Sequence, residues 1–158
     1  MEKMKDIRRA GKDDGIRIAE IFVFNYRLNF YPIFKDDDFY FKTLNVSDMT
    51  EAFEKETENI WVFDDGAVKG FIEISNNEIK RLFVEPVLQG RGIGQRLLEF
   101  AVKEKKVDRL WALEKNTRAI AFYMRHGFIL TEDKKHEEDT EEYLVRMVRR
   151  QGSDEWCI

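Results

Sequence analysis

The spacing of hydrophobic positions predicts a helical first third of the chain. A short strand is expected over residues 6–10, and Asp13 or Asp14 can cap the helix that follows. Further helical pieces are expected after it, interrupted at Pro32 and at the acidic residues 36–38. In the first helix, apolar residues recur at steps of three and four, which predicts one buried face: Ile16, Ala19, Val23 and Tyr26.

The middle of the chain alternates between apolar runs and turn residues, which predicts an antiparallel meander of three strands. The expected strands cover residues 60–63, 68–74 and 78–84. Gly66 and the pair Asn76-Asn77 mark the turns, because both residue types tolerate the left-handed backbone region.

After Pro86, strands and helices alternate. Strands are expected over 109–113, 128–131 and 143–148, and a helix over 119–126 that Gly127 ends. Residues 132–142 include seven acidic and two basic residues, so a solvated hairpin loop is expected there. The helix after the meander has an apolar face: Ile93, Leu97, Leu98, Ala101 and Val102. This order indicates an α/β fold with a mixed, mostly antiparallel central sheet and flanking helices.

Composition narrows the function classes. With 158 residues, we expect one domain over 1–150 and a tail over 151–158. The net charge of −4 gives no long-range attraction to nucleic acid, and no apolar run approaches the roughly 18 residues of a membrane span. The first 14 residues lack the pattern of a secretion signal. Because Cys157 is the single cysteine, we expect a cytoplasmic protein with no disulfide and no metal.

The segment from Val84 to Leu98 carries the most informative pattern. A strand ends, and three glycines at every second position lead into a helix: Gly90, Gly92 and Gly94. Glycine lets several N–H groups approach one oxyanion, and a helix N-terminus adds partial positive charge. Arg91 and Arg96 are expected to add full charges. The loop therefore predicts a phosphate or pyrophosphate ligand, against the alternative of a tight turn that only packs.

Two common phosphate loops do not fit this segment. Gln95 stands where the pattern Gly-x-Gly-x-x-Gly requires its last glycine, and a Gly-Lys-Ser/Thr ending is absent. The preceding meander also disfavours a dinucleotide fold. These observations therefore disfavour the hypothesis of a nucleotide-phosphate-binding protein of another fold.

The loop resembles a known family motif. Gln89-Gly90-Arg91-Gly92-Ile93-Gly94 is similar to the Gln/Arg-x-x-Gly-x-Gly/Ala motif of the GNAT N-acetyltransferases. Residues 116–128 resemble the family's second block, with Asn116, Ala119, Tyr123 and then Gly127-Phe128. The resemblance extends from Lys5 to Arg149 and implies the GNAT fold.

The resemblance also implies a cosubstrate site for acetyl-CoA. In the family, the loop binds the pyrophosphate, here through Gln89, Gly90, Arg91, Gly92, Ile93, Gly94 and Gln95. Backbone groups of Leu82, Phe83 and Val84 are implied to pair with the pantetheine arm, and Asn116 and Phe122 to contact it. Asn116 is equally suited to cap the next helix. For Arg125, a solvated position on the helix is favoured over a contact with the adenosine 3′-phosphate.

Catalytic roles are implied in the same way. Tyr123 occupies the position of the tyrosine that protonates the CoA thiolate, and the alternative is a buried aromatic with a bonded hydroxyl. Glu78, eleven positions before Gln89, is the candidate base. Glu73 or a chain of water molecules could take this role instead. The non-catalytic alternative is that each glutamate is only an exposed carboxylate at the end of a strand. Trp111 replaces the glutamate of the ribosomal-protein branch.

The predicted function is transfer of an acetyl group to a primary amine of a small molecule or peptide, by direct attack in a ternary complex. The alternative is a non-catalytic acyl-CoA-binding or regulatory module. Ten of the 21 aromatic residues lie between Phe22 and Phe53, which favours a core or homodimer interface over a substrate pocket. The acidic loop either attracts a cationic amine or serves solubility.

Overall fold

The computed structural model describes residues 5–150; residues 1–4 and the expected tail 151–158, with Cys157, lie outside the described part. The strands are β1 (Ile7–Arg9), β2 (Ile60–Asp64), β3 (Val68–Ser75), β4 (Glu78–Val84), β5 (Arg109–Leu113), β6 (Phe128–His136) and β7 (Tyr143–Arg149). They form one sheet in the order β1-β2-β3-β4-β5-β7-β6, in which only β4 and β5 pair in parallel. The mixed, mostly antiparallel sheet is confirmed.

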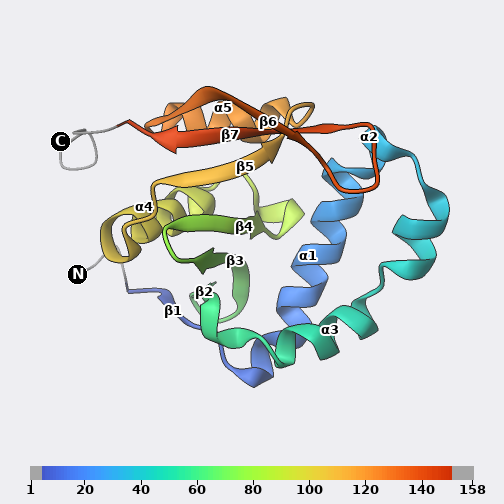
Figure 1. The fold of residues 1–158 in the computed structure, drawn as a ribbon. Coiled ribbons are helices and arrows are strands. Elements are labelled where there is room, and N and C mark those ends of the chain that lie inside the picture. The colour runs from blue at the N-terminus through green and yellow to red at the C-terminus, as the bar shows by residue number, and fades with distance from the viewer. Residues whose placement is uncertain (1–4, 151–158) are drawn as a thin grey trace.

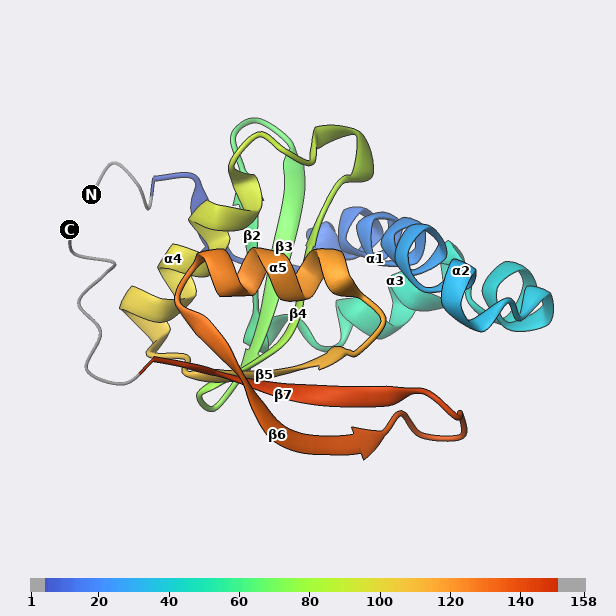
Figure 2. The ribbon, with the colours of Figure 1, turned by 90° about the horizontal axis from the view of Figure 1, so that it is seen from above.

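Helices cover both faces of this sheet. They are α1 (Gly15–Asn29), α2 (Tyr31–Phe34), α3 (Val46–Glu54), α4 (Ile93–Lys105) and α5 (Thr117–Arg125). Short turns of other helix types cover Lys12–Asp14, Phe39–Thr43, Thr57–Asn59 and Pro86–Leu88. Helices α1 and α3 lie on one side of the strands, and α4 and α5 lie on the other (Figures 1 and 2).

The core has two halves because successive side chains of a strand point to opposite faces. On β3, Phe71 packs toward α1 and α3, whereas Ile72 and Ile74 pack toward α4. All five apolar residues that predicted the face of α4 are buried: Ile93, Leu97, Leu98, Ala101 and Val102. The central strands are therefore apolar on both faces.

Strands β4 and β5 pair over two positions only, Glu78 with Arg109 and Ile79 with Leu110. Beyond these positions the two strands separate, as Figure 1 shows. Pro86, which has no N–H to donate, follows the end of β4 and begins a short helical turn. The separation gives β4 an edge that no strand of the described residues pairs with.

Two details differ from the sequence prediction. Ile16 is 54% exposed, because the buried face of α1, which packs against the sheet and α3, is centred on Ile18 and Phe22. Strand β6 continues to His136, so the acidic loop shrinks to residues 137–142. The charged residues in the second half of β6 suit an edge strand, because their side chains can remain in water.

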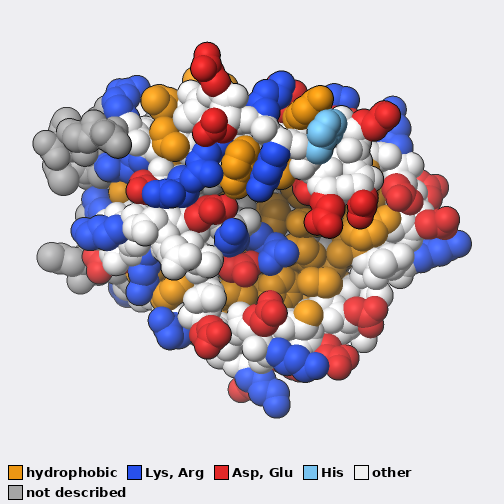
Figure 3. Space-filling view, viewed as in Figure 1, with side chains coloured by type: hydrophobic (Ala, Val, Ile, Leu, Met, Phe, Trp, Pro, Cys, Tyr) orange, Lys and Arg blue, Asp and Glu red, His pale blue; other side chains and the backbone are white. Residues whose placement is uncertain are grey.

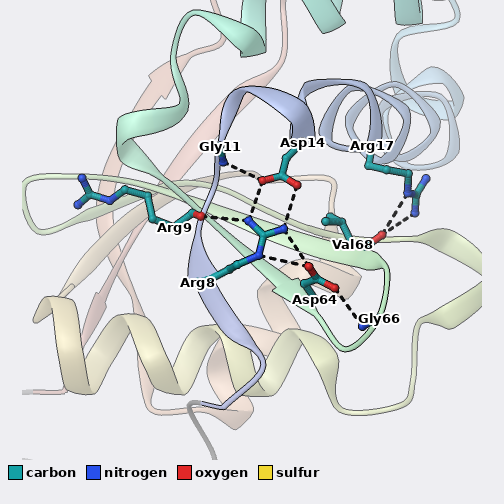
Figure 4. A network of polar contacts seen from close by, with 8 residues as sticks. All are labelled: Arg8, Arg9, Gly11, Asp14, Arg17, Asp64, Gly66 and Val68. Atoms are coloured by element: carbon teal, nitrogen blue, oxygen red, sulfur yellow. Dashed lines mark hydrogen bonds and ion pairs between the residues drawn. The ribbon is translucent and has the colours of Figure 1, made fainter.

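A network of polar contacts ties β1 to the turn before α1 and to the end of β2 (Figure 4). The Arg8 guanidinium donates to both oxygens of Asp14, at 2.8 and 3.0 Å, and to Asp64 at 2.8 Å. Asp14 does not cap α1 with its side chain; its carboxylate accepts from the Gly11 N–H at 2.7 Å. Hydrogen bonds from Arg8 hold the pKa of both carboxyls below the ordinary value.

This network predicts a pH-dependent contribution to stability. A carboxyl with a depressed pKa stabilises the fold above its unfolded pKa of about 3.9, and the contribution is lost as pH falls through the folded pKa. We expect Asp14→Asn to lower the free energy of unfolding at pH 7 by about 1 kcal/mol, with the difference from wild type shrinking toward pH 3. Urea unfolding at pH 7 and at pH 3 measures this difference. Asp38→Asn, at an exposed residue, is the control. Equal pH dependence in Asp14→Asn and wild type would contradict the prediction.

Candidate functional site

Two cavities lie against the separated part of β4. The larger has a volume of about 760 Å³ and the smaller about 580 Å³. Five residues of β4 and of the segment around α5 line both cavities: Leu82, Phe83, Asn116, Ala119 and Tyr123. The cavities therefore adjoin along a common wall.

The predicted anion loop lines the smaller cavity. Gly90 and Gly92 have φ values of +84° and +86°, and a Cβ atom at either would meet no heavy atom within 4 Å. Glycine is therefore required by the backbone conformation, not by crowding. The Arg96 N–H donates to the Gly92 carbonyl and so begins the hydrogen bonding of α4. The preceding three N–H groups are left free for a ligand, as at any helix N-terminus.

Positive charge at this cavity comes from α5. Arg118 and Arg125 line it, and none of its described lining residues is Asp or Glu. Arg118 had no predicted role, and a solvated position was expected for Arg125. The signal that was available is their spacing around Phe122, because positions 118, 122 and 125 share one helical face.

The two loop arginines differ from expectation. Arg91 is exposed and does not line the cavity. Arg96 points toward β1 and β2, where it pairs with Asp6 at 3.3 Å and lies 4.8 Å over the Phe63 ring. The expectation that Arg96 adds charge to the loop is therefore wrong.

A buried amide on α1 holds the loop in place. Asn25 is 1% exposed, and its Nδ2 donates to the carbonyls of Ile21 at 2.8 Å and Val84 at 2.9 Å. Its Oδ1 accepts from Gln89 Nε2 at 3.0 Å, and Gln89 also donates to Val84 at 3.2 Å. Asn25 was not among the predicted site residues, although a polar residue on an apolar helix face was a visible signal.

The remaining predicted cosubstrate residues lie together. Leu82, Phe83, Val84 and Ile93 line the smaller cavity, as do Gly94, Gln95 and Phe122. A Cβ atom on Gly94 would lie 3.5 Å from the Phe122 ring, so α4 and α5 approach closely there. Asn116 caps α5, because its Oδ1 accepts from the Ala119 N–H at 3.3 Å, and it also lines both cavities.

Tyr123 stands in the wall between the cavities. It is 8% exposed and its ring packs against Phe122 and Phe128. No hydrogen bond joins its hydroxyl to another described residue, and burial raises the pKa of the phenol above its ordinary value. The hydroxyl is therefore protonated at neutral pH and has no partner among residues 5–150.

The two candidate bases have different surroundings. Glu78 lines the larger cavity and accepts from Lys80 at 3.4 Å. Glu73 does not line that cavity, and its carboxylate pairs with Arg81 at 2.5 Å. Trp111 lines the larger cavity, with the Lys135 ammonium 4.4 Å from its ring centre.

The aromatic cluster divides between core and cavity. Phe22 and Phe53 are buried between α1, α3 and the sheet, as expected of core residues. Five others line the larger cavity, which the sequence interpretation had ranked second: Tyr26, Phe30, Phe34, Phe39 and Tyr40.

Among residues 5–150, no helix is long and apolar enough to span a membrane. Over the same residues, no group of three or more His, Cys, Asp or Glu side chains is arranged to hold a metal ion.

Comparison with known proteins identifies the family. Residues 56–130 match the family described as acetyltransferase (GNAT) domain. An uncharacterized N-acetyltransferase from Archaeoglobus fulgidus is 34% identical over 137 residues, covering 75% of this chain and 88% of that protein. The chain therefore belongs to the GNAT acetyltransferases.

Solved structures confirm the fold. Apo-form YjaB from Escherichia coli gives a TM-score of 0.69 at 20% identity, covering 90% of this chain and 95% of that one. The PaiA N-acetyltransferase from Thermoplasma acidophilum, solved in complex with coenzyme A, gives 0.59 at 21% identity, covering 89% and 96%.

The Asn25 contacts predict a stability difference between two asparagines of α1. Asn25→Asp keeps the side-chain volume but removes both donated hydrogen bonds and places a carboxylate against two carbonyls. We expect a loss of about 2–3 kcal/mol in the free energy of unfolding. Asn29→Asp is the matched control, because Asn29 lines the same cavity and makes a single longer contact of 3.4 Å. Urea unfolding at pH 7 compares them, and equal losses would contradict the assignment.

Proposed function

We propose that this chain transfers the acetyl group of acetyl-CoA to a primary amine of a small molecule or peptide, by direct attack within a ternary complex. One observation carries the proposal: two cavities of different charge share a wall that contains Tyr123. Among residues 5–150, the charged residues that line the smaller are two arginines, and those that line the larger are five carboxylates and three cations, beside aromatic residues. Two substrates can therefore meet at this wall without a covalent enzyme intermediate. We also infer that residues 1–150 act as one domain.

The smaller cavity suits the anionic part of acetyl-CoA. Free N–H groups at the start of α4, two glycines with positive φ, and Arg118 and Arg125 favour a pyrophosphate. The bound coenzyme A of the Thermoplasma relative supports this choice of ligand. We assign Gln89, Gly90, Gly92, Ile93, Gly94 and Gln95 to this site and leave out Arg91, because it does not line the cavity.

The unpaired edge of β4 suits the amide-bearing pantetheine arm. Buried backbone N–H and C=O groups need partners, and no described strand supplies them beyond Ile79. The Glu85 N–H donates to the Lys69 carbonyl of β3, so alternation along the strand turns the peptide groups of Phe83 toward β3 and those of Leu82 and Val84 toward the open edge. The Val84 carbonyl already accepts from Asn25 and Gln89. Leu82 and the Val84 N–H therefore carry the backbone groups that we assign to this contact, whereas Phe83 lines both cavities.

Tyr123 is the proposed acid. Its raised pKa means that the phenol keeps its proton until negative charge develops on a nearby sulfur, where a hydrogen-bond donor is most useful. Glu78 is the proposed base, because it lines the cavity that we assign to the amine and Glu73 does not. Both carboxylates pair with a cation, but the Glu78 contact with Lys80 at 3.4 Å is longer than the Glu73 contact with Arg81 at 2.5 Å. A water relay is the competing route for that proton. No metal is assigned a role.

The activity test offers the purified chain acetyl-CoA and a panel of amines, and follows release of free CoA thiol. Because Cys157 supplies at most one thiol per chain, turnover beyond one equivalent is unambiguous. Binding of acetyl-CoA without turnover of any amine would instead indicate the non-catalytic acyl-CoA-binding module.

Gly92→Val should weaken binding of coenzyme A strongly while the domain stays folded. A β-branched residue resists a φ of +86°, so the start of α4 would move its free N–H groups. Calorimetry should give an affinity at least about tenfold lower, equivalent to 1.4 kcal/mol. Gly66→Val is the control, because Gly66 also has a positive φ but lies in the β2–β3 turn. Unchanged affinity in Gly92→Val would exclude this loop as the binding site.

Tyr123→Phe should lower kcat by roughly 10²–10⁴-fold with little change in KM for acetyl-CoA, because proton donation matters only in the transition state. The ring packing against Phe128 is retained, so thermal stability should be close to wild type. A variant with near-normal kcat would assign Tyr123 to packing. Joint loss of coenzyme A affinity and stability would identify a structural hydroxyl.

A further inference from the structure

The mouth of the larger cavity is strongly acidic. Figure 3 shows a hollow with a hydrophobic floor, acidic side chains on its edge at the β6–β7 hairpin, and basic side chains over β4. The hairpin supplies Glu137, Glu138 and Asp139, and Asp36 lies in the turn after α2. Together with Glu78, these residues are the acidic side chains that line the cavity in the described part of the chain.

Of the three cations among the described residues that line the same cavity, two are paired with carboxylates: Lys80 with Glu78 at 3.4 Å and Arg81 with Glu73 at 2.5 Å. The third, Lys135, lies over the Trp111 ring and keeps its charge. By contrast, none of the four carboxylates Asp36, Glu137, Glu138 and Asp139 forms an ion pair with another residue in 5–150. The cavity therefore has unbalanced negative charge at its mouth.

The walls beneath these carboxylates are aromatic. Tyr26 of α1, Phe34 of α2 and Phe30 between these helices face the cavity, together with Phe39 and Tyr40. Aromatic faces attract ammonium groups, most strongly where water is excluded. Burial, with the charges of Asp36 and Glu137, raises the pKa of Tyr40 to about 12, so this phenol stays neutral beside the carboxylates.

At the inner end lies an independent sign of a ligand. Tyr123 is 8% exposed, lines the cavity, and has no hydrogen-bond partner for its hydroxyl among the described residues. The oxygen of this otherwise buried side chain is not closed off from the cavity, so a molecule bound there can supply its hydrogen-bond partner. The cavity thus offers a polar reaction end and a cation-selective mouth, joined by an apolar wall.

We propose that the acceptor is an aliphatic diamine or polyamine, with one amine at Tyr123 and a second ammonium held at the mouth by Glu137, Glu138 and the neighbouring rings. This inference rests on the proposed acetyltransferase function. The reacting amine loses one proton to the base and gains the acetyl group, coenzyme A leaves as the free thiol, and the second ammonium is unchanged.

The test compares pentane-1,5-diamine with pentylamine, which differ only in the second amine. We expect kcat/KM to be at least about tenfold higher for the diamine, which corresponds to 1.4 kcal/mol. The variant Glu137→Gln/Glu138→Gln should lose most of this preference and leave pentylamine turnover and acetyl-CoA affinity within about twofold. Added salt should reduce the preference of the wild type, because the mouth is open to solvent.

The matched control is Glu132→Gln/Asp133→Asn. It changes net charge by the same two units on the same hairpin, at exposed residues that do not line the cavity, and should keep the wild-type preference. Equal turnover of both amines by the wild type overturns the inference and leaves the proposed function standing. Turnover confined to lysine-containing peptides, or equal effects of the two double variants, also overturns it. Calorimetric binding of acetyl-CoA with no thiol release from any amine overturns the proposed function as well.

Discussion

The parallel pairing of β4 with β5 ends after two residues, and the site is organised around that early end. A continuous ladder would satisfy the open backbone groups of Leu82 and close the space in which both cavities lie. Because the strands separate, β4 presents unpaired peptide groups beside α5 while its other edge stays hydrogen-bonded to β3. A rigid strand thus carries a polar edge that a ligand can reach, which few positions inside a folded domain allow.

Charge is distributed unevenly about the same wall. Arginines of α5 line the cavity on the side of the glycine loop, and carboxylates of the β6–β7 hairpin line the cavity on the other side. An anionic and a cationic substrate would each be drawn to its own side, which reduces the chance that either blocks the other. Tyr123, between them, is shielded from water by packing against Phe122 and Phe128.

Much of this arrangement could be predicted from local patterns. The bounds of β4 follow from the turn at Asn76-Asn77 and from Pro86, and the bend at the loop follows from glycine spacing, because backbone conformation there depends on nearby residues. The direction of Arg96 could not be predicted, since its partner Asp6 is 90 positions away. The role of Asn25 likewise depends on Val84 and Gln89, which only the tertiary fold brings to α1. The end of β6 was misjudged because charged residues resemble a loop unless their edge position is known.

The two ends of the sheet have a consequence for how copies of this chain can associate. The outermost strands are β1, three residues long with Arg8 and Arg9, and β6, whose second half carries Asp133, Lys134 and Lys135. Short or charged outer strands resist the addition of a further strand. A sheet running continuously through two copies is therefore disfavoured at both ends. The same charges disfavour β-aggregation of the folded protein through these edges.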